Sequence, residues 1–229
     1  GDAGKLLQGS AGRNTLVGSY SGAAGALTGD SNTCVGYQTG YDLTTGGYNV
    51  FVGEQAGEEV TTAVYNTAIG YRALYENVEG DSNVAVGKYA LKNYAAASDG
   101  EGDNVAIGTD CGEFVSTGEN NTFVGTRAAQ GITGTKLTGD ENVCVGYQSG
   151  LLLQGAAHSN TFIGSNSGDV TTTGVENTCL GYGTDIQDAT ATNQIVIGNN
   201  LSGTKDNAVF IGNDTSHIEN DFNADATWN

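Results

Sequence analysis

The side chains of this sequence that could take part in catalysis are mainly carboxylates. The chain of 229 residues carries 26 Asp and Glu against 8 Lys and Arg, for a formal net charge of −18. Glycoside hydrolysis needs two carboxyl groups about 5–9.5 Å apart, flanking the scissile bond. Two groups of acids are close enough along the chain to be considered for that role: Asp110, Glu113 and Glu119, and Glu54, Glu58 and Glu59.

Nothing else in the sequence supports catalysis. It contains no nucleophile elbow, no P-loop and no HExxH motif. In a chain with 26 acids, some pair falls within the required separation by chance. The acids are therefore expected to be solvated turn residues, and the sequence predicts a protein that is not an enzyme.

Calcium is a second chemistry that the acids could support. Four aspartates stand one or two places before a recurrent Asn, so they are expected along one edge: Asp30, Asp81, Asp103 and Asp140. Stacked carboxylates repel, and a hard cation would relieve that repulsion. Aspartate is also a common turn residue that needs no metal. Because no glycine-rich calcium repeat accompanies them, they are weak candidates only, and no cofactor is expected.

Cysteine and histidine are not expected to form a metal site. Cys34, Cys144 and Cys179 occupy a slot that other copies of a repeat fill with apolar residues such as Phe51 and Ala68. The slot therefore predicts free, buried cysteines. No CxxC motif is present, and the two histidines stand far apart at positions 158 and 217.

These residues sit in a repeat that runs along almost the whole chain. Each copy opens with Asn, continues with Thr or Val, a variable residue and then Val, Ile or Leu, and ends with Gly. The opening asparagines are Asn14, Asn32, Asn49, Asn66, Asn83, Asn104, Asn121, Asn142, Asn160 and Asn177. The closing glycines are Gly18, Gly36, Gly53, Gly70, Gly87, Gly108, Gly125, Gly146, Gly164 and Gly181. A period of 17 to 21 residues indicates a solenoid.

One copy of the repeat predicts one coil of an all-β fold. Residues of the Thr, Val and Ile type favour a short strand, and the Gly permits a corner. A second short strand, such as "YRALY", and a polar turn complete the coil. We expect the Asn side chains to form a hydrogen-bonded ladder, the Gly to turn the corner and the β-branched residue to fill the core. The chain is thus predicted to be a parallel β-solenoid, a β-roll or β-helix, of about twelve short coils.

The repeat also sets boundaries. Residues 1–13 are an N-terminal cap or a connection to a preceding segment, 14–212 form the solenoid, and 213–229 form a C-terminal segment. Extra residues in 93–103 and 130–141 are predicted to decorate one corner without disturbing the core. The candidate ligand-contacting residues in these loops are Ser98, Asp99, Glu101, Thr133, Thr135 and Lys136.

The charge and the hydropathy exclude two classes of partner. Phosphate backbones and anionic membrane surfaces both require basic patches, which a chain with only 8 cations does not supply. No apolar run is long enough for a transmembrane helix. Neither nucleic acid nor membrane insertion is expected.

The repeat resembles those of known extracellular fibres. "NTAIGYRALYEN" from Asn66 resembles the repeats of phage tail fibres and related bacterial surface proteins. The late copies "NQIVIG" from Asn193 and "NAVFIG" from Asn207 resemble the repeats of YadA-like trimeric adhesin heads. The resemblance implies a homotrimer, exposed on a virion tail fibre or a cell surface. It also implies that the segment 213–229 adjoins a self-cleaving chaperone domain that has been removed.

The resemblance leaves several functions open. The favoured one is a fibre or adhesin segment that attaches to a cell-surface glycan or protein receptor. The alternatives are a passive spacer, a polysaccharide-degrading tailspike and an ice-binding solenoid. Ice binding is considered because one slot is shared by Thr15, Thr33, Thr67, Thr122, Thr161 and Thr178. Valines interrupt that row, at Val50 and Val84 among others, which disfavours the ice-binding interpretation.

Overall fold

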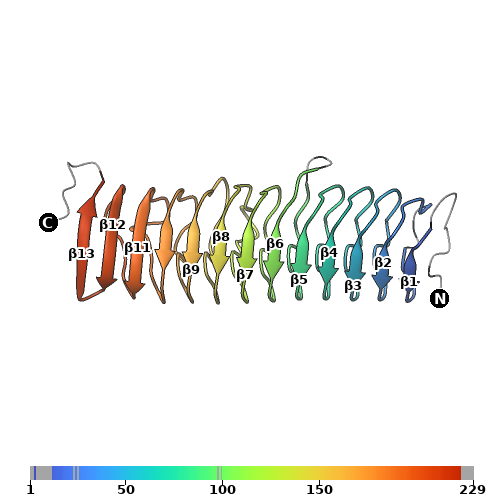
Figure 1. Cartoon of the computed structure of the whole chain (residues 1–229), viewed down its shortest axis with the longest axis horizontal. Coiled ribbons are helices and arrows are strands. Elements are labelled where there is room, and N and C mark those ends of the chain that lie inside the picture. Colours follow the sequence, from blue (N-terminus) through green and yellow to red (C-terminus); the bar gives the residue numbers. More distant parts are fainter. Residues whose placement is uncertain are drawn as a thin grey trace.

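The protein is an all-β solenoid. The computed structural model describes residues 3, 12–22, 24, 26–96, 98 and 100–222, and within these residues it contains thirteen strands and no helix. The strands form one sheet in which each pairs with the next in chain order (Figure 1). Within that part of the chain, accordingly, no helix is long and apolar enough to cross a membrane.

The first ten strands are three residues long, and the last three are twice that length. The strands are β1 (Thr15–Val17), β2 (Thr33–Val35), β3 (Val50–Val52), β4 (Thr67–Ile69), β5 (Val84–Val86), β6 (Val105–Ile107), β7 (Thr122–Val124), β8 (Val143–Val145), β9 (Thr161–Ile163), β10 (Thr178–Leu180), β11 (Gln194–Asn199), β12 (Ala208–Asn213) and β13 (Ser216–Asp221).

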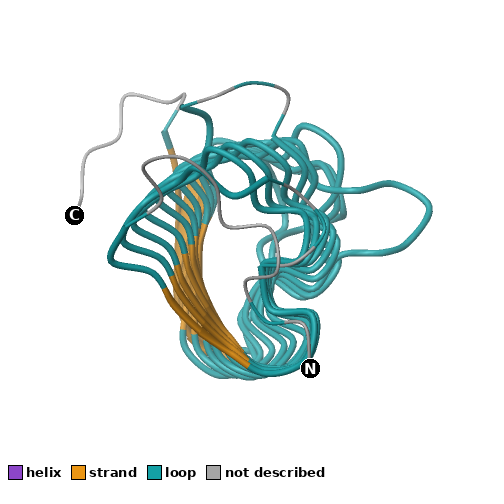
Figure 2. Ribbon diagram, turned by 90° about the vertical axis from the view of Figure 1, so that its right-hand side faces the viewer, coloured by secondary structure: helices purple, strands orange, loops and turns teal. Residues whose placement is uncertain are grey.

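Strands β1 to β12 are parallel and in register, as a solenoid requires. Residue 67 of β4, for example, pairs with residue 84 of β5, so equivalent repeat positions lie one above the other. Eleven turns of backbone connect the twelve strands. The end-on view shows these turns superimposed along a single axis, which confirms the predicted parallel β-solenoid (Figure 2).

The corner glycines are required by their backbone conformation and by close packing. Gly125, in the middle of the rod, has φ +134°, a value that L side chains rarely adopt. A Cβ atom on Gly125 would lie 2.4 Å from the carbonyl oxygen of Gly146, the corner glycine of the next coil. The coils can therefore stack at this corner only because both residues lack a side chain.

The second strand expected in each coil does not form. The segment after the corner consists of turns, because alternate residues take a left-handed backbone conformation, such as Arg72 at φ +51° and Leu74 at φ +53°. The turns nevertheless stack, since the backbone N–H of Gly57 donates to the carbonyl of Ala73 in the next coil, at 3.0 Å. Each coil thus consists of one strand and a run of turns, and the turns of successive coils stack into a column.

The core is filled by the variable residue in the middle of each strand, and its size is matched from across the coil. Phe51 is fully buried, and a Cβ on Gly57 would lie 2.8 Å from its ring. In the next coil the strand residue is Ala68, and Leu74 occupies the place of Gly57. In these two coils a large residue on one side of the core thus faces a small one on the other, as dense packing requires.

The two late copies of the repeat are shifted by one residue from the alignment that their sequence suggests. Thr178 pairs with Ile195, so Gln194 and not Asn193 occupies the ladder position. The backbone N–H of Gln194 donates to Asn177 Oδ1 at 3.0 Å, and the ladder ends one coil later at Ala208. Asn193 and Asn207 lie one place earlier and bond to each other through their side chains, at 2.9 Å. This register accounts for the extra residue that both copies carry.

A β-hairpin closes the C-terminal end of the rod. After β12 the chain turns at residues 214 and 215, and β13 pairs with β12 in the antiparallel sense. Lys205 reaches over to β13 and pairs with Glu219 at 2.8 Å. The hairpin covers the edge of the last parallel strand, which is the capping role expected of the residues after 212. Residues 223–229, and most of the predicted N-terminal cap, lie outside the described residues.

Candidate functional site

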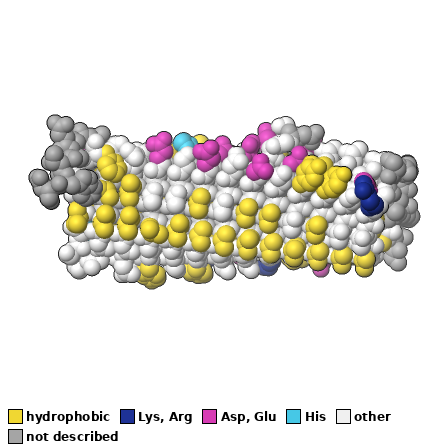
Figure 3. Space-filling model, viewed as in Figure 1, with side chains coloured by type: hydrophobic (Ala, Val, Ile, Leu, Met, Phe, Trp, Pro, Cys, Tyr) yellow, Lys and Arg dark blue, Asp and Glu magenta, His cyan; other side chains and the backbone are white. Residues whose placement is uncertain are grey.

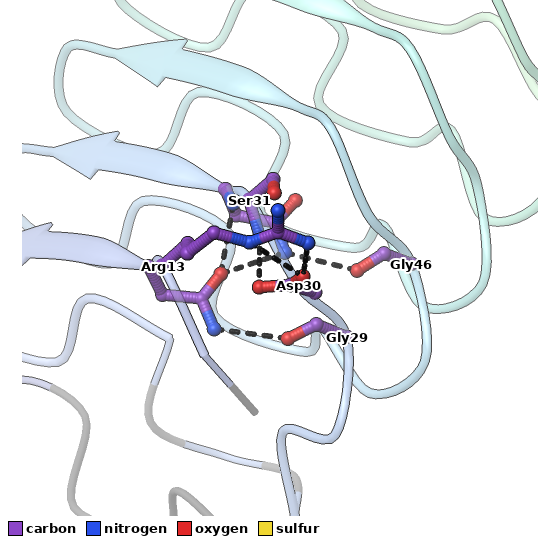
Figure 4. Close-up of polar contacts among 7 residues, drawn as sticks. Arg13, Gly29, Asp30, Ser31 and Gly46 are labelled. Atoms are coloured by element: carbon purple, nitrogen blue, oxygen red, sulfur yellow. Dashed lines mark hydrogen bonds and ion pairs between the residues drawn. The ribbon is translucent and has the colours of Figure 1, made fainter. Parts of the chain in front are cut away.

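The asparagine ladder forms one side of the solenoid. From Asn32 to Asn177, the backbone N–H of each ladder Asn donates to the side-chain oxygen of the preceding one, at 2.8–3.2 Å. Within the described residues, the side-chain amide of every coil except that of Asn83 also donates to a carbonyl of the turn that closes the coil. The amide of Asn83 donates to Asp81, in the turn before it. Asn14 donates to Gly29, and Asn32 to Gly46 (Figure 4). Asn32 and the eight that follow it are fully buried, so the row is structural and offers no group to a ligand.

The outward face of the sheet carries a continuous row of aliphatic side chains. The third residue of the strand motif is Val, Ile or Leu in all twelve parallel strands, and none of the twelve is buried. Val17 is 55% exposed and Leu180 43%. We call this row the aliphatic stripe: Val17, Val35, Val52, Ile69, Val86, Ile107, Val124, Val145, Ile163, Leu180, Ile197 and Ile211. The repeat predicts that these residues fill the core, and that prediction is wrong.

The aliphatic stripe faces outward because side chains alternate in direction along a strand. Successive residues point to opposite faces of a sheet. The ladder Asn and the variable residue two places later both face inward, so the residue between them and the β-branched residue before the corner must face outward. The aliphatic stripe is consequently accompanied by a second outward row, in which Thr and Val alternate irregularly.

No charged residue interrupts this face. Although the chain carries 34 charged Asp, Glu, Lys and Arg side chains, none stands at either outward position of β1 to β12. In Figure 3 the apolar side chains accordingly form a band along the rod, while the acids gather along one margin. With strand spacings of about 4.8 Å, the band is about 53 Å long and covers several hundred Å². Patches of this size on soluble proteins mark interaction sites.

The four calcium candidates do not form one row. Asp81 and Asp140 occupy equivalent positions, where Oδ1 accepts the backbone N–H of Val64 and Glu119 respectively, each at 2.8 Å. Asp30 stands at the same position in its coil but pairs with the guanidinium of Arg13 (Figure 4), whereas Asp103 lies one place nearer the ladder. The described residues contain no group of three or more His, Cys, Asp or Glu that could hold a metal ion. The contacts of Asp81 and Asp140 are those of turn residues.

Of the two clusters of acids considered for catalysis, the one that contains Glu58 and Glu59 lies close to other charged side chains. Burial raises the pKa of Glu58 and Glu59, and the charge of Asp42 raises both further. Lys136, from the second insertion, pairs with nearby Glu76 at 3.4 Å. In the other group, Glu113 accepts a hydrogen bond from Gln130 at 2.9 Å, and burial raises the pKa of Glu119. These contacts assign no acid and base roles.

The two insertions leave the coil at different points, and not at one corner. The first follows the buried Tyr94, and there Ser98 donates to Glu101 at 2.9 Å. The second precedes the equivalent buried residue, Leu137, and forms a small bridge between Ile132 and Thr135. Thr133 and Thr135 are exposed, and Asp99 lies outside the described residues. Figure 1 shows the connection between β5 and β6, which includes the first insertion, rising above its neighbours. The loops are therefore separate candidates.

A hollow of about 300 Å³ lies near the C-terminal end of the rod. It is lined by Asn199, Asn200, Asn213, Asp214 and Thr215, at the ends of β11 and β12. Asn213 uses its Oδ1 to accept hydrogen bonds from the backbone N–H groups of Thr215 and Ser216. That contact shapes the hairpin turn, so at least part of this lining is structural.

Asp185 gives the solenoid a pH-dependent stability. Burial, followed by the charge of Asp169 and a hydrogen bond with it, raises the pKa of Asp185 to about 7. Between about pH 4 and 7 the folded state therefore holds a proton that the unfolded state has lost. The stabilisation by protonated Asp185 is complete at low pH and is lost as the pH rises through 7.

We expect Asp185→Asn to raise the melting temperature by about 2–5 °C at pH 8 and to leave it nearly unchanged at pH 4.5. Asparagine keeps the oxygen that accepts from Val170 and removes the charge. Asp188→Asn is the matched control, because Asp188 is exposed and hydrogen bonds from Thr190 lower its pKa. Calorimetry at both pH values makes the comparison, and equal effects of Asp185→Asn at pH 4.5 and 8 would contradict this account.

The four cysteines are free and fully buried, as the repeat slot predicted for three of them. Burial raises the pKa of Cys34 and of Cys111 to about 12. We expect all four thiols of the native protein to resist an aromatic disulfide reagent, and all four to react in denaturant. Colorimetric titration with and without denaturant measures this. Rapid reaction of even one thiol in the native protein would show that its coil is open.

No family model, no curated protein and no solved structure matches this chain. The class of the protein is therefore defined by its fold, a parallel β-solenoid with a buried asparagine ladder. Its candidate functional surface is the uncharged outward face of the sheet.

Proposed function

We propose that the chain is a segment of a homotrimeric fibre or adhesin that attaches to the surface of a host cell. The observation that carries this proposal is the aliphatic stripe, which is half-exposed along the full length of the parallel sheet. An apolar band of this length is costly to leave in water. It requires a partner of the same length and the same lack of charge.

A second copy of the chain meets that requirement. Every copy carries the same stripe with the same spacing, so parallel copies in register bring aliphatic residues together in every coil. Acids gather along one margin of the face, and the net charge of −18 opposes association except where the uncharged stripes meet. Three copies, and not two, is the stoichiometry that the resemblance to tail fibres and trimeric adhesins implies.

In such a trimer the stripe lies at the axis, and the insertions remain free to meet a receptor. Thr133 and Thr135 are exposed at the tip of one insertion, and Ser98 in the other. The receptor class is a cell-surface glycan or protein, and the setting is a virion tail fibre or the outside of a cell. The proposal includes no catalysis, no cofactor, no nucleic acid and no membrane insertion.

The principal alternative is a passive spacer of the same fibre, which would share the trimer and bind no receptor. A fluorescent derivative of the chain, mixed with a panel of bacterial cells, separates the two by flow cytometry. Saturable binding to at least one strain, competed by unlabelled protein, supports attachment. Formation of the trimer without binding to any strain would contradict attachment and favour the spacer.

Two further alternatives assign the molecule a different activity. Ice binding would use the outward face itself, and it predicts thermal hysteresis by a monomer. A tailspike would release reducing ends from a capsular polysaccharide, and replacing Glu58 and Glu59 by Gln would abolish that release. Neither outcome is expected.

A further inference from the structure

A pair of stacked tyrosines stands out on the acidic margin of the rod. The rings of Tyr48 and Tyr65 lie 5.1 Å apart between centroids, with 21° between their planes. The two tyrosines belong to adjacent coils, and each immediately precedes a ladder Asn. They are 51% and 60% exposed, so more than half of this aromatic surface is in contact with solvent. In Figure 3 a yellow group beside a blue cation lies near the N-terminal end of this face, apart from the band.

The tyrosines occupy an unfavourable backbone position. The residue before each ladder Asn has a left-handed conformation, with φ +58° at Tyr48 and +61° at Tyr65. This conformation is a genuine outlier for bulky residues, whereas Asn and Asp tolerate it. Other coils place Ser, Asp, Asn or Glu there, and the first coil places Arg13. Two aromatic rings at these positions are not needed for the solenoid, which forms with serine in the coils on either side.

Those flanking serines leave the outer faces of the pair uncovered within the row. Ser31 precedes Tyr48 and Ser82 follows Tyr65, both in the same left-handed conformation. A serine side chain is too short to cover a phenol ring in the neighbouring coil. The Tyr65 end of the stacked pair therefore presents a flat aromatic face with the Ser82 hydroxyl beside it, whereas Arg13 lies close to the hydroxyl of Tyr48.

Polar groups frame the pair and hold it in place. Asp30 accepts from Arg13 Nε at 3.0 Å, and this pairing raises the pKa of Arg13, with a smaller contribution from the Tyr48 hydroxyl. Asp81 Oδ1 binds the backbone N–H of Val64, which fixes the chain immediately before Tyr65. Beyond Ser82 stands the exposed Asp103. Hydrogen-bond donors and acceptors thus stand at both ends of the aromatic surface.

We propose that Tyr48 and Tyr65 form a stacking platform for neutral pyranose rings. The C–H-rich face of a pyranose is apolar and slightly positive, which complements the negative face of an aromatic ring. The ring hydroxyls can meet Ser82, Asp103 and the Arg13–Asp30 pair. Because three carboxylates surround the platform, it disfavours uronic and sialic acids. The inference deepens the proposed attachment function by naming a ligand class and a site.

The test is a titration of the full chain with methyl β-D-galactopyranoside, methyl β-D-glucopyranoside and glucuronic acid, followed by saturation-transfer NMR. The key variant is Tyr48→Ser with Tyr65→Ser, since serine occupies this position in the adjacent coils. Tyr182→Ser is the matched control, because Tyr182 is 55% exposed at a different corner. Circular-dichroism melting establishes that each variant is folded.

We expect millimolar binding of at least one neutral pyranoside and weaker binding of glucuronic acid. The double variant should bind about tenfold more weakly, because it removes both aromatic rings of the platform. Tyr182→Ser should bind as the unmodified chain does. Absence of neutral pyranoside binding, equal affinity of the double variant, or preference for glucuronic acid would each overturn the platform.

The outcome is separable from that of the attachment proposal. Sugar binding by the platform needs one chain only, whereas cell attachment is measured on the assembled protein. A chain that attaches to cells but binds no pyranoside retains the fibre function and loses the platform. A chain that binds pyranosides but attaches to no cell retains the platform and loses the attachment function.

Discussion

Replacing Asn104 by Ala is expected to lower the free energy of unfolding by about 3–5 kcal/mol. Asn104 Oδ1 accepts from both the backbone N–H and the side-chain amide of Asn121, at 3.0 and 3.1 Å. Its own amide donates to Gly118 at 2.9 Å. Alanine leaves these partners without their bonds in a fully buried row, where water does not replace them. The loss is large because one side chain serves two coils.

Urea denaturation followed by circular dichroism measures this effect through the midpoint and the slope of the transition. Asn120→Gly is the matched control, because Asn120 is the exposed neighbour of the ladder and its left-handed φ of +56° suits glycine. We expect the control to change stability by less than about 1 kcal/mol. A loss below about 1 kcal/mol for Asn104→Ala would show that the ladder does not hold the coils together.

Replacing Ile107 by Glu is expected to dissociate the proposed trimer while leaving each chain folded. Ile107 lies at the middle of the aliphatic stripe and is 42% exposed, so a carboxylate there is solvated in the single chain. In the trimer, three carboxylates would meet in an apolar seam without partners. We expect the dissociation constant to rise by more than about a hundredfold.

Sedimentation velocity over a range of concentrations measures the assembly, and circular dichroism the fold. The matched control is Val78→Glu, which introduces the same charge at an aliphatic residue outside the stripe that is 36% exposed. Val78→Glu should sediment as the unmodified chain does. If the Ile107→Glu variant associates to the same extent as the unmodified chain, the stripe is not part of the interface.

The fold was predictable because its determinants recur. The corner Gly follows the ladder Asn by four residues in each of ten copies, and only a stacked structure gives each of them one repeated environment. The structure supplies that environment in detail. A Cβ on Gly125 would collide with the next corner, and each Asn binds the one before it.

The outward direction of the stripe can also be predicted from the sequence. The hydrophobic, β-branched character of these residues predicts a core position, which is wrong. The cysteines of the preceding slot already indicated which residues face inward, and alternation along the strand then places Ile107 outside. Hydrophobicity alone places the stripe on the inward face of the sheet, whereas the two-residue alternation of side chains along a strand places it on the outward face.

Other features could not be read from one chain. The segment after the corner looks like a strand, as in "YRALY", but Arg72 and Leu74 take left-handed conformations that no local preference predicts. The stacking of Tyr48 on Tyr65 depends on the same backbone state in two successive coils. The pairing of Lys136 with Glu76 joins residues sixty positions apart across several coils. Each of these three features depends on how the coils stack, and the sequence of a single coil does not determine that.

The most direct test of the fibre proposal is the native mass of the unmodified chain. Size-exclusion chromatography with multi-angle light scattering, at neutral pH in reducing buffer, gives that mass without assuming a shape. The proposal predicts three times the chain mass of 23.3 kDa. A mass of one chain at all accessible concentrations would contradict it, because the aliphatic stripe would then be stable in water without a partner of its own kind.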